Sequence, residues 1–356
     1  MVNGSACYKA PVSLAATLPP QADVVIIGGG FAGCATAWAL AERGVRALVL
    51  EREPALGRHA SGRGAGLGRQ LVEDDVTSAL VIRGAAVLRE RFATAWSPTG
   101  GILSFDDEER AGIYEARARR LGIAYERIDR AAVLARWPAM TGVPIVVALL
   151  VPSDGIIDVR AVLDSYASGL QLACDVGVTS ISEVGGGVRL DTTRGAVHAK
   201  VVVDATGAWA GQLTGASAVE SFKRHLFVVE AAPTPAAPYF WHLGRQELYV
   251  RSDGAATLAS ACDVESTSPL DQSPAPDADA RLRARLSPAA PAWGETPIVR
   301  RWACQRAFTP DRRMRIGRDP HRPWLVWAVG LGGHGATASP AVGELAAAAV
   351  LESGRV

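Results

Sequence analysis

The chain has 356 residues, of which 49% are hydrophobic, and its formal net charge is +1. This length exceeds the size at which a single core usually stops growing, so we expect two domains. The charges are dispersed and nearly balanced, which excludes the basic surface typical of proteins that bind nucleic acid or acidic membranes. We therefore expect a small-molecule partner.

The five cysteines are odd in number and form no CxxC pattern, so we expect neither a disulfide framework nor a metal site. A reducing, cytoplasmic compartment fits this usage. No apolar run reaches the length of a transmembrane helix or of a signal-peptide core. We therefore expect a cytoplasmic protein without a transmembrane segment, whose residues 1–19 form a flexible tail.

A βαβ unit is predicted near the N-terminus, between Asp23 and Glu51. "DVVIIG" is a continuous β-branched run, "FAGCATAWALAERG" is a helix of small residues closed by Gly44, and "RALVLE" is a second buried strand. Strand, turn, helix and strand in this order begin a parallel sheet. The pattern predicts an α/β fold with a Rossmann-like domain around a central parallel sheet.

The turn of this unit carries the glycine spacing of a dinucleotide-binding loop. Gly28 permits the tight turn, Gly30 permits close approach to a pyrophosphate, and Gly33 permits close packing of helix on strand. Phe31 and Ala32 begin the helix, whose free N–H groups point at the phosphates. We expect all five residues to contact the cofactor.

Glu51 ends the second strand, where a carboxylate accepts both hydroxyls of an adenosine ribose. A carboxylate at this position disfavours a 2′-phosphate. The candidates that remain are NAD and FAD.

The rest of the chain is less regular. A glycine-rich basic loop, "GRHASGRGAGLGRQ", precedes a helix around residues 76–92, and short strands alternate with charged helices over 100–151. Residues 176–204 predict a β-meander with a hairpin turn at 185–187. The acidic, proline-rich segment 265–280, "ESTSPLDQSPAPDADA", is expected to be an exposed loop. The chain ends in a strand, a glycine turn and an alanine-rich helix.

This order favours FAD over NAD. An NAD dehydrogenase continues as alternating strands and helices, whereas "VVVDATGAWA" (201–210) returns to the sheet only after about 150 residues. "GLGGHGATAS" (330–339) adds another glycine turn at the start of a helix. A cofactor touched by the beginning, middle and end of the chain is long, as FAD is. No second GxGxxG precedes a helix, so we expect the organic substrate, and not NAD(P)H, to be the reductant.

Five motifs in chain order resemble those of the D-amino-acid oxidase and glycine oxidase superfamily of flavoenzymes: "GGGFAGCATAWALAERG", "LERE", "HASGRGAG", "VVVDATGAWA" and "GLGGHGATASPAVGELAA". The resemblance covers nearly the whole chain from about Ala22. Within the superfamily, "LEREPALGRHASGRGAG", "QELYVRSDG" and "WACQRAFTPD" are most similar to bacterial D-arginine dehydrogenases and their relatives.

The resemblance implies further contacts with FAD beyond the first loop. The residues implied are Arg52, Ser61, Arg63, Gly66, Val178, Thr206, Gly207, Trp209, Gly332, Gly333, His334, Gly335, Ala336 and Thr337. The helix that starts near Thr337 would direct its positive end at the N1/O2 edge of the flavin. Relatives with covalent flavin carry Cys or His where this chain has Arg306 and Arg63, so non-covalent FAD is expected.

The resemblance also implies a substrate site. Arg306 matches a guanidinium that grips the substrate carboxylate, Tyr249 matches a tyrosine that adds a hydroxyl, and Arg224 matches a second arginine. His334, in the flavin-side turn, completes the set of candidate catalytic residues. The segment "SPTGGILSFDDEE" (97–109) would line the side-chain pocket. Because it carries Gly100 and Gly101 in place of an acidic partner, we do not expect a preference for D-arginine.

The function implied is FAD-dependent oxidation of the C–N bond of a D-amino acid, glycine or N-alkyl glycine. Hydride passes to flavin N5, and the imine is hydrolysed to a 2-oxo acid. O2 or a quinone-type acceptor would reoxidise the flavin. The alternatives are a dehydrogenase of a 2-hydroxy acid or glycerol phosphate on the same fold, and a non-catalytic flavin-binding subunit.

The two domains are expected to be interleaved along the chain. The FAD-binding domain is assigned to 20–90, 150–215 and 300–356. An α+β substrate domain with an antiparallel sheet is assigned to 91–149 and 216–299, as in the D-amino-acid oxidase type of fold.

Overall fold

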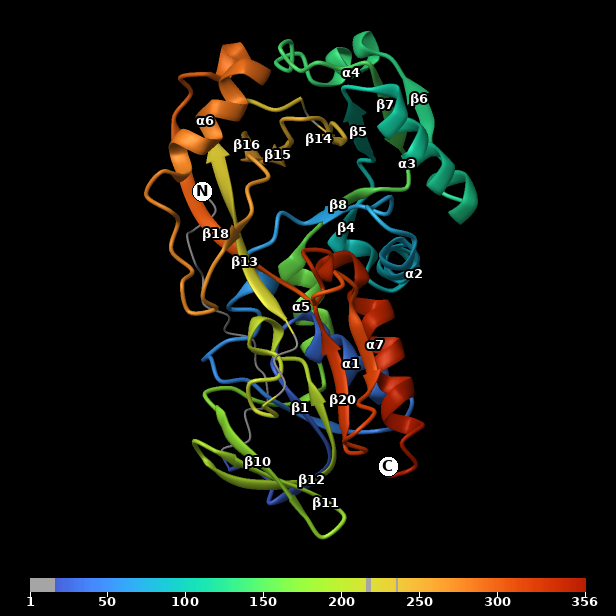
Figure 1. Ribbon diagram of the computed structural model, residues 1–356, viewed down its shortest axis with the longest axis vertical. Coiled ribbons are helices and arrows are strands. Elements are labelled where there is room, and N and C mark those ends of the chain that lie inside the picture. The colour runs from blue at the N-terminus through green and yellow to red at the C-terminus, as the bar shows by residue number, and fades with distance from the viewer. Residues whose placement is uncertain (1–16, 216–218, 235) are drawn as a thin grey trace.

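The computed structural model describes residues 17–215, 219–234 and 236–356, so Cys7 and most of the expected N-terminal tail lie outside the described residues. Two large sheets dominate the molecule and lie at opposite ends of its long axis (Figure 1). The first, at the lower end, contains the predicted βαβ unit.

The βαβ unit is confirmed. Strand β1 (Gln21–Ile27) runs parallel to β2 (Ala47–Leu50), and helix α1 (Phe31–Ala41) connects them. The last four residues of β1, Val24–Ile27, and all four residues of β2 are buried, and all of them except Ala47 are Val, Ile or Leu, as a parallel sheet covered on both faces requires. The parallel core has the order β20–β12–β1–β2–β9, with β9 at Gln171–Ala173 and β20 at Leu325–Val329.

The predicted meander extends this sheet. It comprises β10 (Val178–Val184), β11 (Gly187–Thr192) and β12 (Gly195–Asp204), paired antiparallel. Gly185 and Gly186 form the hairpin turn, as expected, so this glycine cluster is not a phosphate loop. The first half of β12 pairs with β11 and the second half with β1 and β20, which brings Asp204 to the carboxyl edge of the parallel core.

Helices cover the parallel strands. Helix α7 (Gly335–Leu351) packs on α1 so closely that a Cβ at Gly343 would meet the carbonyl of Ala35. Helix α2 (Asp75–Arg91) packs against α7, and α5 (Val159–Ala167) packs against α1 (Figure 1). The Asp74 side chain caps α2 by accepting from the N–H of Thr77 at 2.8 Å. The small residues of α1 and α7 allow this close packing.

The second large sheet is predominantly antiparallel, in the order β17–β13–β16–β15–β14–β5–β7–β6, with β18 on the other side of β13. Its strands are β5 (Gly101–Phe105), β6 (Glu126–Ile128), β7 (Val147–Val151), β13 (Glu220–Val229), β14 (Tyr239–His242), β15 (Leu248–Asp253), β16 (Ala256–Ser260), β17 (Glu265–Ser266) and β18 (Ile298–Phe308). Helices α3 (Glu108–Leu121), α4 (Arg130–Arg136) and α6 (Ala278–Ala289) accompany it.

Smaller strands complete the chain. β3 (Leu67–Gly68), β4 (Trp96–Ser97) and β8 (Gly155–Ile157) form a small sheet between the two large ones, and β19 (Arg315–Arg318) pairs with β20.

One predicted domain boundary, between residues 299 and 300, falls inside strand β18. Residues 300–308 were assigned to the first domain, but they belong to β18, which pairs with β13 along Glu220–Val229 in the second sheet. The reason is that β18, a strand of eleven residues, pairs along almost its whole length with β13, a strand of ten residues. β13 and β18 extend together toward the first sheet (Figure 1). Arg306 on β18 therefore reaches the glycine turn at residues 330–334.

The predicted exposed loop at 265–280 is right only in part. Its first two residues form β17, and residues from Ala278 onward belong to α6. The stretch between them is tied to the sheet: Lys223 Nζ lies 2.8 Å from a carboxylate oxygen of Asp271, and the N–H of Ala275 donates to His225 Nε2 at 2.9 Å. Lys223 itself is 4% exposed. Because these contacts attach residues 267–277 to strand β13, this segment, called the strap below, is not a freely solvated connector.

Candidate active site

A long cavity runs from the first sheet to the second, and its wall includes residues from the beginning, middle and end of the chain. Most of the predicted cofactor residues line it. They are Gly28, Gly30, Phe31, Ala32, Glu51, Arg52, Ser61, Gly66, Val178, Thr206, Gly207, Trp209, Gly332, Gly333, His334, Gly335, Ala336 and Thr337.

The glycine loop forms the floor of the cavity at the carboxyl end of β1. Gly28 has φ +110°, a region that side chains other than glycine rarely adopt, and a Cβ there would lie 2.5 Å from the carbonyl oxygen of Ala205. A Cβ at Gly33 would meet the carbonyl of Gly28, so this glycine serves helix packing and does not line the cavity. The N-cap residue Gly30 has no side chain to cap α1, and beyond the N–H of Phe31, which donates to Ser61, the next N–H groups of the helix are left available to a phosphate.

Ser61 and Glu51 shape the two sides of this loop. Ser61 Oγ accepts from the N–H of Phe31 at 2.9 Å. Glu51 accepts from the N–H groups of Gly29 at 2.7 Å and Glu53 at 2.9 Å, although burial raises the pKa of its carboxyl. The carboxylate therefore fixes the loop and still lines the cavity where the ribose of a dinucleotide is expected.

The middle of the chain closes the cavity from another side. Asp204 ends β12 and accepts from Thr206 Oγ1 at 2.6 Å and from the N–H of Gly211 at 3.1 Å, which holds the turn 205–211 in place. Trp209 in this turn stacks under the guanidinium of Arg52, whose Cζ lies 3.8 Å from the ring centroid. The contact joins the second strand of the βαβ unit to the return of the chain 150 residues later.

The glycine turn 330–334 and the start of α7 form the third side. No side chain caps α7 at its N-terminus, and the hydroxyl of Thr337 donates to the carbonyl of Leu67 at 3.1 Å. The helix starts at Gly335, two residues before the predicted start, and its positive end faces the cavity. An isoalloxazine that carries negative charge when reduced fits this position.

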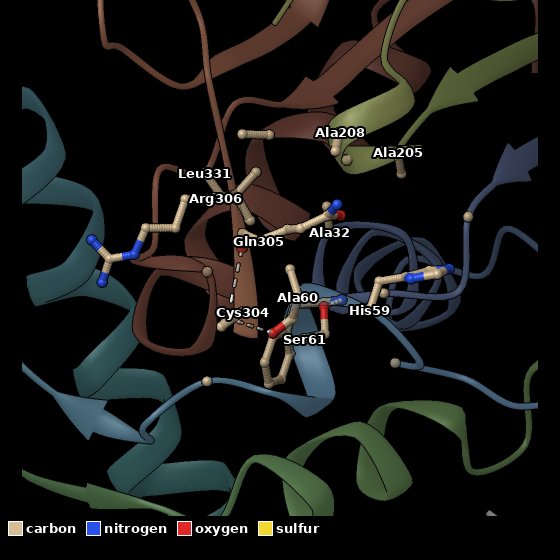
Figure 2. A pocket seen from close by; sticks show the side chains of 18 of the residues that line it. Ala32, His59, Ala60, Ser61, Ala205, Ala208, Cys304, Gln305, Arg306 and Leu331 are labelled. Atoms are coloured by element: carbon tan, nitrogen blue, oxygen red, sulfur yellow. Dashed lines mark hydrogen bonds between the residues drawn. The ribbon is translucent and has the colours of Figure 1, made fainter. Parts of the chain in front are cut away.

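Three predicted substrate residues meet at the end of the cavity beyond this turn. Arg306, Arg224 and Tyr249 all line it, from three strands of the second sheet. In Figure 2 the guanidinium of Arg306 extends away from the side on which Ala32, Ser61 and His59 lie. Burial, and then the charge of Arg224, lowers the pKa of Arg306 to about 10, whereas burial raises the pKa of Tyr249 to about 12. Tyr249 is therefore a neutral hydroxyl near pH 7.

Two further residues line this end of the cavity and were not predicted from the sequence: Arg69 and Trp241. The Cζ of Arg69 lies 4.4 Å from the Trp241 ring centroid, and its Nη1 donates to Glu73 at 3.0 Å. Glu73 also lies 3.6 Å from His334 Nε2. Arg69 stands in the basic glycine loop that the sequence singled out, so its charge was visible there, but Trp241 gave no comparable signal.

Two parts of the chain that were expected at the site lie outside the cavity wall. Arg63 does not line the cavity, because its Nη1 donates to the carbonyls of Ala303 at 3.2 Å and Gln272 at 3.4 Å and so bridges β18 to the strap. No residue of the segment 97–109 lines the cavity either. Gly101 instead packs against the Tyr239 ring, which fills the space that a side chain would need.

The cysteines of the described residues are free thiols. Cys304 lies on β18 beside Ala60 (Figure 2), and burial raises the pKa of its thiol. Among the described residues, no three His, Cys, Asp or Glu side chains are grouped so that they could hold a metal ion. Of the helices in these ranges, none is both long and apolar enough to cross a bilayer.

The sequence matches the family described as DAO, FAD dependent oxidoreductase, over residues 23–349. It is 27% identical to the glycine oxidase of Geobacillus kaustophilus over 349 residues, which cover 91% of this chain and 92% of that protein. It is 29% identical to the mitochondrial sarcosine dehydrogenase of Mus musculus over 236 residues, 60% of this chain. That match spans 26% of the sarcosine dehydrogenase, about a quarter of its length.

Solved structures share the fold. The crystal structure of L-proline dehydrogenase from P. horikoshii superposes with a TM-score of 0.85 at 22% identity and covers 93% of both chains. That of glycine oxidase from Geobacillus kaustophilus has a TM-score of 0.81 at 25% identity and covers 94% of this chain and 95% of that one. The expected fold class is confirmed.

Proposed function

Because the chain belongs to the DAO family of FAD dependent oxidoreductases, we propose that it oxidises the C–N bond of an amino acid. FAD, its cofactor, supplies the acceptor for the two electrons that leave the substrate as a hydride equivalent. The product is an imine, which water hydrolyses to a 2-oxo acid and ammonia or an alkylamine. The substrate is a D-amino acid, glycine or an N-alkyl glycine.

The observation that carries this proposal is the side chain of Arg306. It forms no hydrogen bond or ion pair with any described residue, and it lines the cavity beside the glycine turn. A guanidinium without a protein partner in a cavity wall suits a carboxylate, which it binds through two parallel N–H···O bonds. The neutral hydroxyl of Tyr249 supplies a further donor to the same group.

Each residue of the site has a role in this reaction. Arg306 and Tyr249 hold the substrate carboxylate and so fix the position of Cα. The turn 330–334 and the N-terminus of α7 provide N–H groups for the side of the flavin that gains negative charge. Trp241 and Leu226 give the wall apolar surface that limits the access of water.

The names of the related proteins support an amine or amino acid as substrate, since they include a glycine oxidase, a sarcosine dehydrogenase and an L-proline dehydrogenase. Glycine and sarcosine are achiral, and the name of the proline dehydrogenase specifies the L-enantiomer. Both enantiomers therefore belong in the test.

The test is an anaerobic titration of the purified holoenzyme with D- and L-amino acids, glycine, sarcosine, proline and 2-hydroxy acids, followed by the visible absorbance of the flavin. Bleaching by at least one amine or amino acid is expected. Bleaching by hydroxy acids alone would mean that the protein oxidises a C–O bond and not a C–N bond. Flavin that stays oxidised with every compound would indicate a non-catalytic subunit. Mixing the reduced enzyme with O2 or with a quinone then identifies the acceptor.

A further inference from the structure

The substrate end of the cavity holds more positive charge than one carboxylate neutralises. Arg69, Arg224 and Arg306 all line it. Among the described residues, the one carboxylate in the cavity wall is Glu51, which lies at the glycine loop and binds the N–H groups of Gly29 and Glu53. The three guanidiniums must therefore be balanced by other groups.

The positive charge of Arg69 is neutralised within the protein, by Glu73. Its Nη1 donates to Glu73, its Nε donates to the carbonyl of Leu71 at 2.9 Å, and its guanidinium stacks on Trp241. This arginine adds a hydrogen-bond donor, because its Nη2 has no acceptor among the described residues, but it adds no uncompensated charge.

Arg224 is fixed but not neutralised. The residue is 5% exposed, its Nε donates to the carbonyl of Asp263 at 3.2 Å and its Nη2 to that of Cys262 at 3.1 Å. Its Nη1 is buried and has no acceptor within the described ranges. The carboxylate of Asp263 is instead bound by the backbone N–H of His225 at 3.0 Å and by His225 Nδ1 at 2.5 Å.

Two guanidiniums, Arg224 and Arg306, thus line one cavity without a carboxylate at ion-pair distance in the described chain. Burial, and then the charge of Arg224, lowers the pKa of Arg306. A guanidinium without a counter-ion is unfavourable in an enclosed site, so anions that bind there relieve the unfavourable arrangement of two. One carboxylate shared by both arginines would leave a net positive charge.

We propose that the substrate is an amino acid that carries a second carboxylate. Arg306 and Tyr249 bind the carboxylate next to the reacting carbon, and Arg224 binds the second through its free Nη1. The substrate class is then of the aspartate or glutamate type, or a glycine with a carboxyalkyl group on nitrogen. This inference rests on the proposed function and adds the side-chain preference to it.

The test compares pairs that differ only in a carboxylate and its amide: aspartate with asparagine, and glutamate with glutamine, in both enantiomers. We expect kcat/KM for flavin reduction by the dicarboxylate to exceed that of its amide by at least about tenfold, because hydrogen bonds between charged partners are the strong ones. If the amide, or alanine, is oxidised as well as the dicarboxylate, the inference is overturned while the proposed function stands.

Arg224→Gln tests the assigned residue. In this variant the ratio of kcat/KM between dicarboxylate and amide should fall to within about threefold of unity. The matched control is Arg300→Gln on the same strand as Arg306, where the side chain is 48% exposed and points to Asp253; it should keep the wild-type ratio. A preference that survives Arg224→Gln would contradict the assignment.

A second measurement does not depend on turnover or on the folding of the variant. Unreactive carboxylates that enter the site perturb the flavin spectrum of the oxidised wild-type holoenzyme. Succinate and malonate should bind at least about tenfold more tightly than butanoate and propanoate. Equal affinities would overturn the inference, and this outcome is distinct from a failure of the proposed function, in which no amino acid bleaches the flavin.

Discussion

The guanidinium of Arg306 lies against the backbone of Gly333: a Cβ built on this glycine would be 2.9 Å from both Cζ and Nε of the arginine. The contact connects β18 of the second sheet with the glycine turn of the first. The residue that we propose to bind substrate and the turn that we propose to border the flavin are thereby held in fixed relation. In an enzyme of this type, small displacements between such groups reduce the rate strongly.

Gly333→Ala should therefore impair oxidation. The added methyl group would push the Arg306 guanidinium from its place, and φ at this position is +93°, which also disfavours a side chain. We expect kcat/KM to fall by about tenfold or more. Stopped-flow flavin reduction measures this, and the flavin content of the purified variant is determined in parallel.

The control is Gly112→Ala in α3, outside the cavity wall, where nothing lies within 4 Å of an added Cβ. It should keep near wild-type kcat/KM. If Gly333→Ala retained full activity at full flavin content, the contact with Arg306 would have no role in positioning.

Tyr249→Phe removes one expected donor to the substrate carboxylate and leaves the ring in place. Since burial keeps the pKa of this tyrosine at about 12, its hydroxyl carries a proton throughout the neutral range. We expect kcat/KM to fall about tenfold, mainly through KM. Tyr125→Phe, outside the cavity wall, is the matched control and should have no effect. Unchanged steady-state kinetics with the best substrate would show that Tyr249 is a core residue.

The βαβ unit and the meander were predictable because their signals are local. An uninterrupted run such as "DVVIIG" and the glycines at 185–187 fix their own conformations through burial and turn geometry. The resemblance to the D-amino-acid oxidase superfamily, drawn from five motifs, is confirmed by the family match over residues 23–349. The closer likeness to D-arginine dehydrogenases stays a prediction.

The structure differs from the predictions where contacts between residues distant in the sequence determine the position of a strand or side chain. Residues 300–308 were assigned to the FAD-binding domain, and nothing in their sequence states that β13 is the neighbour of β18. The family resemblance implied that Arg63 contacts FAD, but its side chain donates to the carbonyls of Ala303 and Gln272, more than 200 residues away. Trp241 was missed because a tryptophan in a strand is more often a core residue, and only the folded chain brings it to Arg69.

Gly28→Ala should abolish or severely weaken FAD binding. A side chain at φ +110° is strained, and its Cβ would lie 2.5 Å from the carbonyl oxygen of Ala205, so the loop that faces the phosphates must move. The ratio of flavin to protein absorbance and the dissociation constant for added FAD measure the effect. We expect the affinity to fall by about 100-fold or more.

A glycine elsewhere provides the control. At Gly112 in α3 nothing lies within 4 Å of an added Cβ, so Gly112→Ala should leave FAD binding unchanged and stabilise the helix by about 0.5–1 kcal/mol. A Gly28→Ala variant with normal flavin content would refute the role of this glycine in the dinucleotide-binding loop.

The lowered pKa of His334 predicts how the free energy of unfolding depends on pH. Burial, followed by the positive charges of Arg69 and Arg306, lowers its pKa from 6.5 to about 4, against the opposing attraction of Glu73. The unfolded chain therefore takes up a proton at higher pH than the folded chain does. Protonation favours unfolding, so the free energy of unfolding should fall as the pH decreases from about 6.5 toward 4, by about 1–3 kcal/mol from this group.

His334→Asn removes this contribution. Urea unfolding of wild type and variant, at a fixed excess of FAD and at several pH values in this window, gives the two slopes. The variant should lose less stability on acidification, whereas His198→Asn, at an exposed position of β12, should follow the wild type. Parallel curves for wild type and His334→Asn would mean that the pKa of this histidine is not lowered in the folded protein; on acidification it would then take up a proton and add a further positive charge to the cavity that Arg224 and Arg306 line.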